Sequence, residues 1–150
     1  MGHNTIALIC DCDETLCPDT SNALIEAVGF NAGRFWGECA EMVATGWDPP
    51  LAYLSHLVDL SQQGKGPRLS LAKLQEVGRS VTFYRGVPQF LTRLRGALDQ
   101  NAEYRDAGIQ LEWYVVSGGI EELLQATSIA RHATDIFGCT IAYDSAGFAP

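Results

Sequence analysis

The feature that most limits the fold of this chain is a short apolar run that ends directly in an acidic motif. The run Thr5-Ile6-Ala7-Leu8-Ile9-Cys10 is rich in residues typical of a buried strand. The motif Asp11-Cys12-Asp13-Glu14-Thr15-Leu16 follows it at once. Side chains at positions i and i+2 of an extended backbone point to the same side. Asp11 and Asp13 are therefore predicted to face the crevice at the carboxyl end of a parallel strand, the usual ligand site of open α/β sheets.

Two interpretations of the acidic motif follow from the residues alone. Carboxylates this close repel each other unless a cation or a proton compensates them, and a metal-assisted phosphoryl-transfer site uses that property. In the simpler interpretation, a strand runs into a solvated acidic turn, and Asp13 or Thr15 caps a helix. The motif by itself is compatible with both.

Helical and strand patterns alternate along the rest of the chain. Residues 20 to 80 have helical spacing, and Gly46-Trp47-Asp48-Pro49-Pro50 interrupts them. An amphipathic helix is expected from Gly86, a second buried strand over Ile109–Val116, and a third short strand over Thr140–Tyr143. This order predicts an α/β fold with a Rossmann-like parallel sheet and an all-helical insertion after the first strand.

Composition excludes several classes of protein. A chain of 150 residues fits one domain with a sizeable core. The formal charge of −8 argues against a nucleic-acid partner, because phosphate backbones require clustered Lys and Arg. No apolar run is long enough for a membrane span or a signal peptide. The five cysteines are odd in number and irregularly spaced, which predicts reduced, mostly buried thiols of a cytoplasmic protein.

The second informative element is Val115-Val116-Ser117-Gly118-Gly119. A hydroxyl at the end of a strand, followed by glycines and a helix N-terminus, is suited to hold a phosphate oxygen. In the alternative interpretation, Ser117 only caps the following helix. Parallel strands would bring Ser117 beside Asp11, and this combination is far more specific than either element alone.

Taken together, these residues resemble the haloacid dehalogenase-like hydrolase superfamily. Asp11-Cys12-Asp13-Glu14-Thr15-Leu16 matches its first motif, and the apolar run that ends at Ser117 matches its second. The helical block followed by Tyr84-Arg85-Gly86-Val87-Pro88 is similar to the helical-cap type of phosphoserine-phosphatase-like members. The resemblance implies an incomplete core formed by residues 1–18 and 81–150, with residues 19–80 as the helical cap.

The resemblance also implies roles for single residues. Asp11 would be the nucleophile that forms an aspartyl-phosphate, and Asp13 would protonate the leaving oxygen and later activate water. The Asp11 carboxylate and the Asp13 backbone carbonyl would bind Mg²⁺. Thr15 would fix the motif loop and belong to the phosphate-binding residues. Ser117 and the Gly118 N–H would bind the transferring phosphoryl oxygens. An Asp at position 13 favours a phosphatase over a dehalogenase, because the leaving oxygen needs a proton.

Two parts of the family's site have no counterpart in the sequence. No Lys follows Lys73, and Arg131 precedes the position expected for a substitute. Asp135 and Asp144 do not form an acidic pair behind an apolar strand. We therefore expect a chain truncated before the third and fourth motifs, with a naturally short form as the alternative.

The predicted function is that of a Mg²⁺-dependent phosphomonoesterase acting on a small phosphorylated metabolite. A catalytically silent binding or regulatory domain and a receiver-like phosphoacceptor are the alternatives. Candidates for substrate selection lie in the helical block, namely Arg34, Trp36, Trp47 and His56. No pattern in the sequence indicates a particular substrate or oligomeric state.

Overall fold

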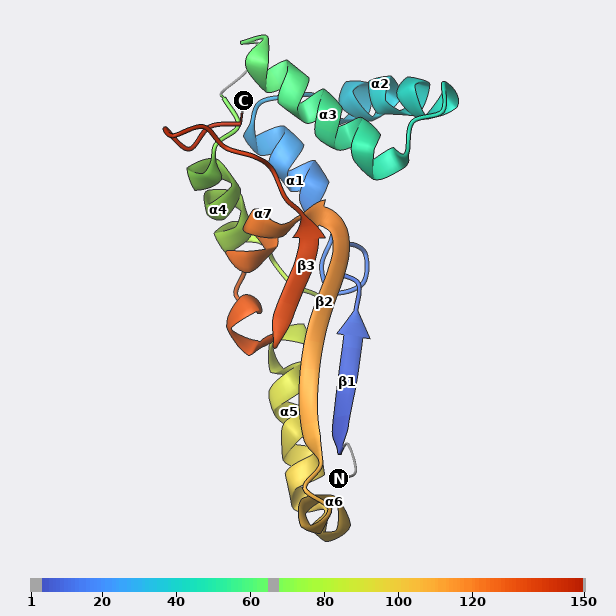
Figure 1. Ribbon diagram of the computed structural model, residues 1–150, viewed down its shortest axis with the longest axis vertical. Coiled ribbons are helices and arrows are strands. Elements are labelled where there is room, and N and C mark those ends of the chain that lie inside the picture. The colour runs from blue at the N-terminus through green and yellow to red at the C-terminus, as the bar shows by residue number, and fades with distance from the viewer. Residues whose placement is uncertain (1–3, 65–67, 150) are drawn as a thin grey trace.

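Three parallel strands form the centre of the computed structural model, which describes residues 4–64 and 68–149. They are β1 (Thr5–Cys10), β2 (Gln110–Ile120) and β3 (Asp135–Cys139), in the order β1-β2-β3 (Figure 1). The register of β1 on β2 runs from Thr5 opposite Gln110 to Cys10 opposite Val115. Because β1 and β2 are parallel, the residues that follow Cys10 and Val115 meet at the same edge of the sheet.

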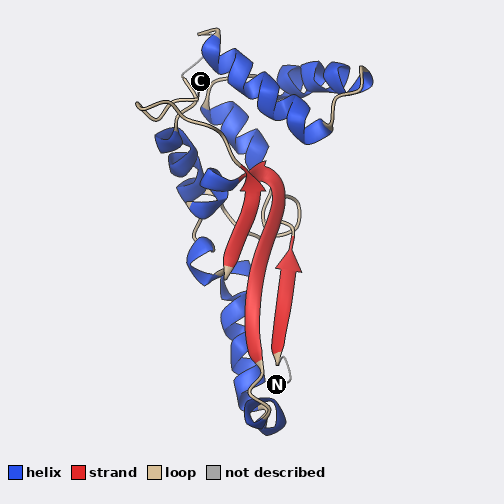
Figure 2. Ribbon diagram, in the orientation of Figure 1, coloured by secondary structure: helices blue, strands red, loops and turns tan. Residues whose placement is uncertain are grey.

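Seven α-helices accompany the sheet in the described part of the chain, and six of them lie between β1 and β2 in sequence. They are α1 (Thr20–Ala27), α2 (Ala32–Ala44), α3 (Pro49–Gln62), α4 (Leu71–Ser80), α5 (Val87–Gln100), α6 (Ala102–Asp106) and α7 (Glu121–Gln125). Figure 2 shows α2 and α3 beyond the carboxyl ends of the strands, whereas α4, α5 and α7 run along one side of the sheet. The predicted α/β class, with a parallel sheet and a helical insertion after the first strand, is confirmed.

Local sequence signals set where the helices begin. Five of them have an N-cap side chain that accepts a backbone N–H from the first turn: Asp19, Asn31, Asp48, Ser70 and Asn101. Pro49 and Pro50 occupy the first turn of α3, where a missing N–H costs nothing. Gly86 precedes α5 at a φ of 96°, a left-handed conformation that glycine adopts readily. None of the helices within the described ranges is long and apolar enough to cross a membrane.

Two strand boundaries differ from the sequence prediction. The third strand is Asp135–Cys139, whereas the predicted segment Thr140–Tyr143 has no regular structure. The pairing of β3 with β2 explains the shift, because this register buries Ile136 in the core. The second strand continues through the glycines to Ile120, with an irregular register between Val116 and Ile120. The predicted end of that strand at Ser117 is therefore wrong.

The two faces of the sheet have different environments. On one face, Trp113 and Val115 of β2 belong to the same buried apolar cluster as Leu91 of α5 and Leu123 of α7. Alternate residues point to the other face, where Ile9 is 65% exposed and Phe137 is 49% exposed. The helices along the packed face hold the strands in place, and the strand ends carry the residues considered next.

Candidate active site

A tight loop after β1 positions the two acids of the first motif. The Cys12 carbonyl accepts N–H groups from Thr15 at 3.2 Å, Leu16 at 2.7 Å and Cys17 at 3.3 Å. Glu14 has a φ of 56° and donates its N–H to the Cys17 carbonyl at 2.8 Å. The loop therefore closes on itself within six residues, and it presents acids beyond the carboxyl end of β1.

Asp13 is held at the start of α1. Its Oδ1 accepts the Thr20 N–H at 2.8 Å, so the carboxylate faces the positive end of the helix. Burial of the carboxyl group raises the pKa of Asp13, and the hydrogen bond from Thr20 offsets only part of that effect. Asp13 consequently holds a proton to higher pH than an ordinary aspartate does, which suits a proton donor.

Asp11 is more open to solvent than Asp13. The Thr15 hydroxyl donates to Asp11 Oδ2 at 3.3 Å, so the threonine of the motif fixes one carboxylate oxygen. The other oxygen is free of this contact. This arrangement orients a carboxylate without removing it from solvent, as a nucleophile that meets a diffusing substrate requires.

Ser117 and its glycines form the second strand of the site. Ser117 Oγ accepts the Gly119 N–H at 3.0 Å, and the Gly118 carbonyl accepts the Tyr53 hydroxyl at 3.0 Å. The interpretation of Ser117 as a helix cap is wrong, because Ile120 is the N-cap of α7 and makes no side-chain cap bond. The helix N-terminus expected next to Ser117 begins only at Glu121, because the glycines belong to β2.

Gly119 lies between Ser117 and the half-buried Asp13. A methyl group placed on Gly119 would lie 3.2 Å from Ser117 Oγ and 3.4 Å from Asp13 Oδ2. The two oxygens, one from the loop after β1 and one from β2, thus converge on the same small volume. Only a residue without a side chain leaves that volume free.

One cavity of about 280 Å³ joins these groups. Four of the five site residues predicted from the sequence line it: Asp11, Asp13, Ser117 and Gly118. The fifth, Thr15, is outside the lining and contacts the site through its hydrogen bond to Asp11. The helical insertion supplies the opposite wall with Trp36, Pro49, Pro50 and Tyr53. Sequence reasoning included Trp36 among four candidates and missed Tyr53, because its place depends on how α3 packs across the site.

Two aromatic rings hold this wall together. The Trp36 and Tyr53 ring centroids lie 5.8 Å apart, and Trp36 Nε1 donates to Asn22 Oδ1 at 2.5 Å. Burial raises the pKa of the Tyr53 hydroxyl, which keeps it protonated as a donor to the Gly118 carbonyl. The insertion is therefore hydrogen-bonded directly to the serine–glycine segment.

The charge of the cavity is one-sided. Its lining includes the acids Asp11, Asp13, Glu14 and Asp19, and no Lys or Arg among the described residues. Arg131 is exposed and donates to His132 at 3.1 Å, and Asp144 pairs with Arg68 at 3.4 Å. Asp135 starts β3 and so lies at the opposite end of the sheet. None of these later residues lines the cavity, so none adds a positive charge or a further acid to it.

The donor types bear on which metal the site fits. Oxygen atoms, as in carboxylates and carbonyls, are the ligands that Mg²⁺ prefers, and the loop after β1 contributes Asp11, Asp13 and Glu14 to the cavity lining. A second group of metal-competent atoms, from Cys12, Asp13 and Cys17, lies within 4.8 Å of one another. Thiols favour soft metals over Mg²⁺, so the acid side of the loop is the part that fits a hard cation.

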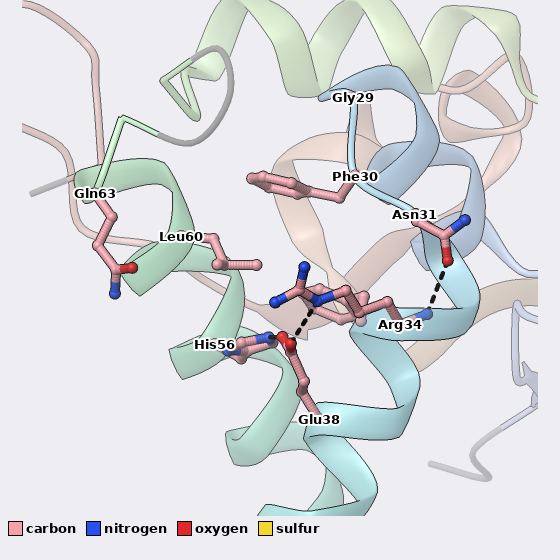
Figure 3. Close-up of a pocket in the computed structure, with 9 residues that line it drawn as sticks. Gly29, Phe30, Asn31, Arg34, Glu38, His56, Leu60 and Gln63 are labelled. Atoms are coloured by element: carbon pink, nitrogen blue, oxygen red, sulfur yellow. Dashed lines mark hydrogen bonds and ion pairs between the residues drawn. The ribbon is translucent and has the colours of Figure 1, made fainter.

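A larger cavity of about 410 Å³ lies within the helical insertion and does not include the acids (Figure 3). Arg34 Nε donates to Glu38 Oε1 at 2.8 Å, and His56 Nε2 lies 2.8 Å from Glu38 Oε2. Arg34 and His56 therefore belong to this second cavity, and Trp47 is exposed outside both. Of the four residues proposed for substrate selection, Trp36 alone lines the acidic cavity.

Comparisons with known proteins support the fold. No family model matches the sequence. An uncharacterized protein of Borreliella burgdorferi is 24% identical over 145 residues, which cover 91% of this chain and 50% of the relative. The chain thus spans about half the length of the curated relative that it matches.

Solved structures are similar over nearly the whole chain. A HAD family hydrolase from Salmonella enterica serovar Typhi has a TM-score of 0.68 at 14% identity, over 97% of this chain and 44% of its own. A phosphoserine phosphatase bearing a phospho-aspartyl intermediate analogue has a TM-score of 0.65 at 14% identity, over 98% and 61%. A substrate-bound phosphoserine phosphatase has a TM-score of 0.62 at 13% identity, over 99% and 62%. The chain has a HAD-like fold.

Proposed function

We propose that this chain carries the nucleophile and the proton donor of a Mg²⁺-dependent phosphomonoesterase that acts on a small phosphorylated metabolite. One observation carries the proposal. Asp11 and Asp13 follow β1, the Ser117–Gly118 segment lies near the carboxyl end of the adjacent parallel strand β2, and all of them line the same cavity. The hydrolase and phosphatase names of the structural neighbours agree with it.

The proposed reaction has two steps. The Asp11 carboxylate attacks phosphorus, and the bond from phosphorus to the ester oxygen breaks as the Asp13 carboxyl gives its proton to that oxygen. A water molecule then attacks the aspartyl-phosphate while the Asp13 carboxylate accepts its proton, which releases inorganic phosphate and restores Asp11. The raised pKa of Asp13 supports the first role, and the Thr15 hydrogen bond supports a fixed orientation of Asp11.

The serine segment would bind the phosphoryl oxygens. Because Ser117 Oγ already accepts the Gly119 N–H, its own hydrogen is free to be donated to a phosphate oxygen. The Tyr53 bond to the Gly118 carbonyl restrains the glycine peptide that flanks this contact. Donors fixed before the substrate arrives stabilise developing charge better than mobile ones do.

Mg²⁺ would be held by the Asp11 carboxylate and the Asp13 backbone carbonyl. When bound, it supplies positive charge that offsets the repulsion between a carboxylate nucleophile and a phosphate dianion. The acid-rich lining of the cavity, without a basic side chain among the described residues, supports a requirement for such a cation.

The size and the walls of the cavity support a small substrate. A volume of about 280 Å³ accommodates a phosphate ester with a short organic group. In this proposal, α2 and α3 act as a cap, with Trp36 and Tyr53 against the organic part of the substrate. Cytoplasmic metabolites of this kind are the proposed substrate class.

Hydrolysis of two phosphate esters tests the proposal. p-Nitrophenyl phosphate has a good leaving group, whereas an alkyl phosphate needs a proton on its leaving oxygen. We expect Mg²⁺-dependent turnover that Asp11→Asn abolishes for both esters, and that Asp13→Asn reduces far more for the alkyl ester. Asp59→Asn, at an exposed position on α3, is the matched control and should behave as wild type. Mg²⁺-independent turnover that survives Asp11→Asn would refute the proposal.

A silent binding domain is the second candidate function. The absence of a basic side chain from the described cavity lining favours it, because turnover of a dianion benefits from a fixed positive charge. Mg²⁺ and phosphate would then raise the melting temperature by binding the native state, without ester hydrolysis. Measurement of both quantities on the same sample separates the two functions.

A further inference from the structure

Two thiols inside the acidic loop are in contact with each other, and the proposed reaction uses neither. Cys12 Sγ lies 3.7 Å from Cys17 Sγ, and both residues are 0% exposed. Cys17 Sγ is also 3.9 Å from the Cys12 carbonyl. The pair flanks Asp13 and Thr15, so any bond between the sulfurs would close a ring around two residues of the candidate site.

The backbone already brings the two cysteines side by side. Cys17 donates its N–H to the Cys12 carbonyl at 3.3 Å, and Asp13 forms an isolated bridge with Cys17. A disulfide has an S–S length of about 2.05 Å, so the sulfurs must approach by about 1.6 Å from their 3.7 Å contact. Side-chain rotation and a small loop shift can supply this distance, whereas a pair on separate elements would need a larger movement.

We propose that Cys12 and Cys17 are a modification site, a dithiol that a low-molecular-weight disulfide oxidises to an intramolecular disulfide, and that this bond weakens ligand binding at the acids. The effect on ligand binding rests on the proposed function, whereas formation of the disulfide does not.

The chemistry proceeds by two exchanges. One cysteine sulfur, on losing its proton, attacks glutathione disulfide, and one glutathione leaves as a thiolate that takes up a proton. The second cysteine sulfur then attacks the mixed disulfide and displaces the other glutathione. Two protein thiols are oxidised by two electrons, and one glutathione disulfide is reduced to two glutathione molecules. Because both sulfurs are shielded from solvent, the first exchange waits for opening of the loop and is slow.

The consequence for the site follows from two contacts of the residues inside the ring. Asp13 Oδ1 accepts from Thr20 at 2.8 Å, and the Thr15 hydroxyl reaches Asp11 Oδ2 at 3.3 Å. The second contact is already near the limit of a hydrogen bond, so a loop shift of a few tenths of an ångström removes it. Oxidation is therefore expected to release Asp11 from its fixed orientation and to displace the Asp13 carbonyl.

The test uses the full chain incubated with glutathione disulfide. We expect the intact mass to fall by about 2 Da, one hydrogen from each thiol, and peptide mapping to join Cys12 to Cys17. Cys12→Ser and Cys17→Ala should each abolish this product, and two different variants guard against one that fails to fold. Cys39→Ser, at a buried cysteine of α2, is the matched control and should keep it. Glutathione adducts on single cysteines without an internal bond, or tightly bound zinc that protects both thiols, would overturn the inference.

A second readout tests the effect on the site. Trp36 lines the acidic cavity, so its fluorescence can report titrations with Mg²⁺ and inorganic phosphate. We expect phosphate affinity to fall about tenfold on oxidation and to recover with dithiothreitol, a change of about 1.4 kcal/mol. Unchanged affinity after complete disulfide formation would overturn the inhibitory half. A reduced chain that binds no phosphate yet forms the disulfide would support the modification site and contradict the proposed function.

Discussion

Replacement of Gly78 by alanine tests the packing that supports the second strand of the site. Gly78 lies on α4 where this helix packs against α7, the helix that directly follows β2. A methyl group on Gly78 would lie 2.2 Å from the Leu123 carbonyl oxygen and 2.9 Å from Ala126 Cβ. The nearest atom belongs to the backbone and cannot rotate away, so α4 and α7 must separate to accept the methyl group.

The magnitude follows from two opposing effects. Alanine is favoured over glycine inside a helix by about 1 kcal/mol. Overpacking of a close contact costs about 1–3 kcal/mol, and a rigid backbone neighbour places this case at the upper end. We therefore expect Gly78→Ala to lower the free energy of unfolding by about 1–2 kcal/mol, the difference between these two effects.

Two glycines in other helices provide matched controls. At Gly37 of α2 and Gly96 of α5, an added methyl group would have no atom within 4 Å apart from those of its chain neighbours and the nearby backbone of its own helix. Alanine at either position should raise the free energy of unfolding by about 0.5–1 kcal/mol, because only the helix preference acts there. Urea unfolding of the three variants gives the comparison, with an unchanged m-value as the check on two-state behaviour. A Gly78→Ala protein as stable as the two controls would refute the close approach of α4 and α7.

Three further predictions concern the cavity. Burial raises the pKa of Asp13 above its ordinary 3.8. Below that pH the carboxyl group is protonated in both the folded and the unfolded protein, so it costs no stability. As pH rises through the folded pKa, the group loses its proton in the folded protein and destabilises the fold. Asp13→Asn should therefore raise the melting temperature at pH 7 while lowering turnover of the alkyl phosphate, and the gain in melting temperature should vanish below about pH 3.8 in thermal unfolding at a series of pH values. Gly119→Ala should lower phosphate affinity about tenfold or more, measured by isothermal titration, since its methyl group occupies the volume between Ser117 and Asp13. Tyr53→Phe should cost about 1 kcal/mol of stability and lower kcat/KM, because the Gly118 carbonyl loses its partner; unchanged kinetics would contradict a positioning role.

The extent to which sequence predicts this molecule depends on how local each signal is. Asp11 and Asp13 are separated by one residue after an apolar strand, so chain geometry alone places them on one side of the sheet end. Ser117 requires one further assumption, that two parallel strands are neighbours, and the structure has that arrangement. Tyr53 requires the packing of α3 against the end of the sheet, for which the sequence near residue 53 contains no signal.

The third strand shows a different limit. Asp135–Cys139 and Thr140–Tyr143 are adjacent, and both contain several apolar residues. Only the pairing with β2, from Tyr114 opposite Asp135 to Val116 opposite Phe137, decides between them. Gly138 adds a constraint that no pattern reveals, because a methyl group there would lie 2.8 Å from the Glu121 backbone nitrogen. Tertiary contacts thus selected the segment that can approach α7 closely.

The electrostatics of the acidic cavity link its two proposed ligands. With acids on the lining and no basic side chain among the described residues, a phosphate dianion entering alone meets only negative charge and a few neutral donors. A divalent cation entering alone leaves ligand positions that the acids of one loop do not fill. Each ligand therefore supplies what the other lacks, and reciprocity requires that Mg²⁺ strengthen phosphate binding by the same factor as phosphate strengthens Mg²⁺ binding. In the proposed enzyme, the half-buried carboxyl of Asp13 fits this scheme, since its raised pKa makes it gain a proton more readily than an ordinary aspartate and so reduces the repulsion that the first ligand must overcome.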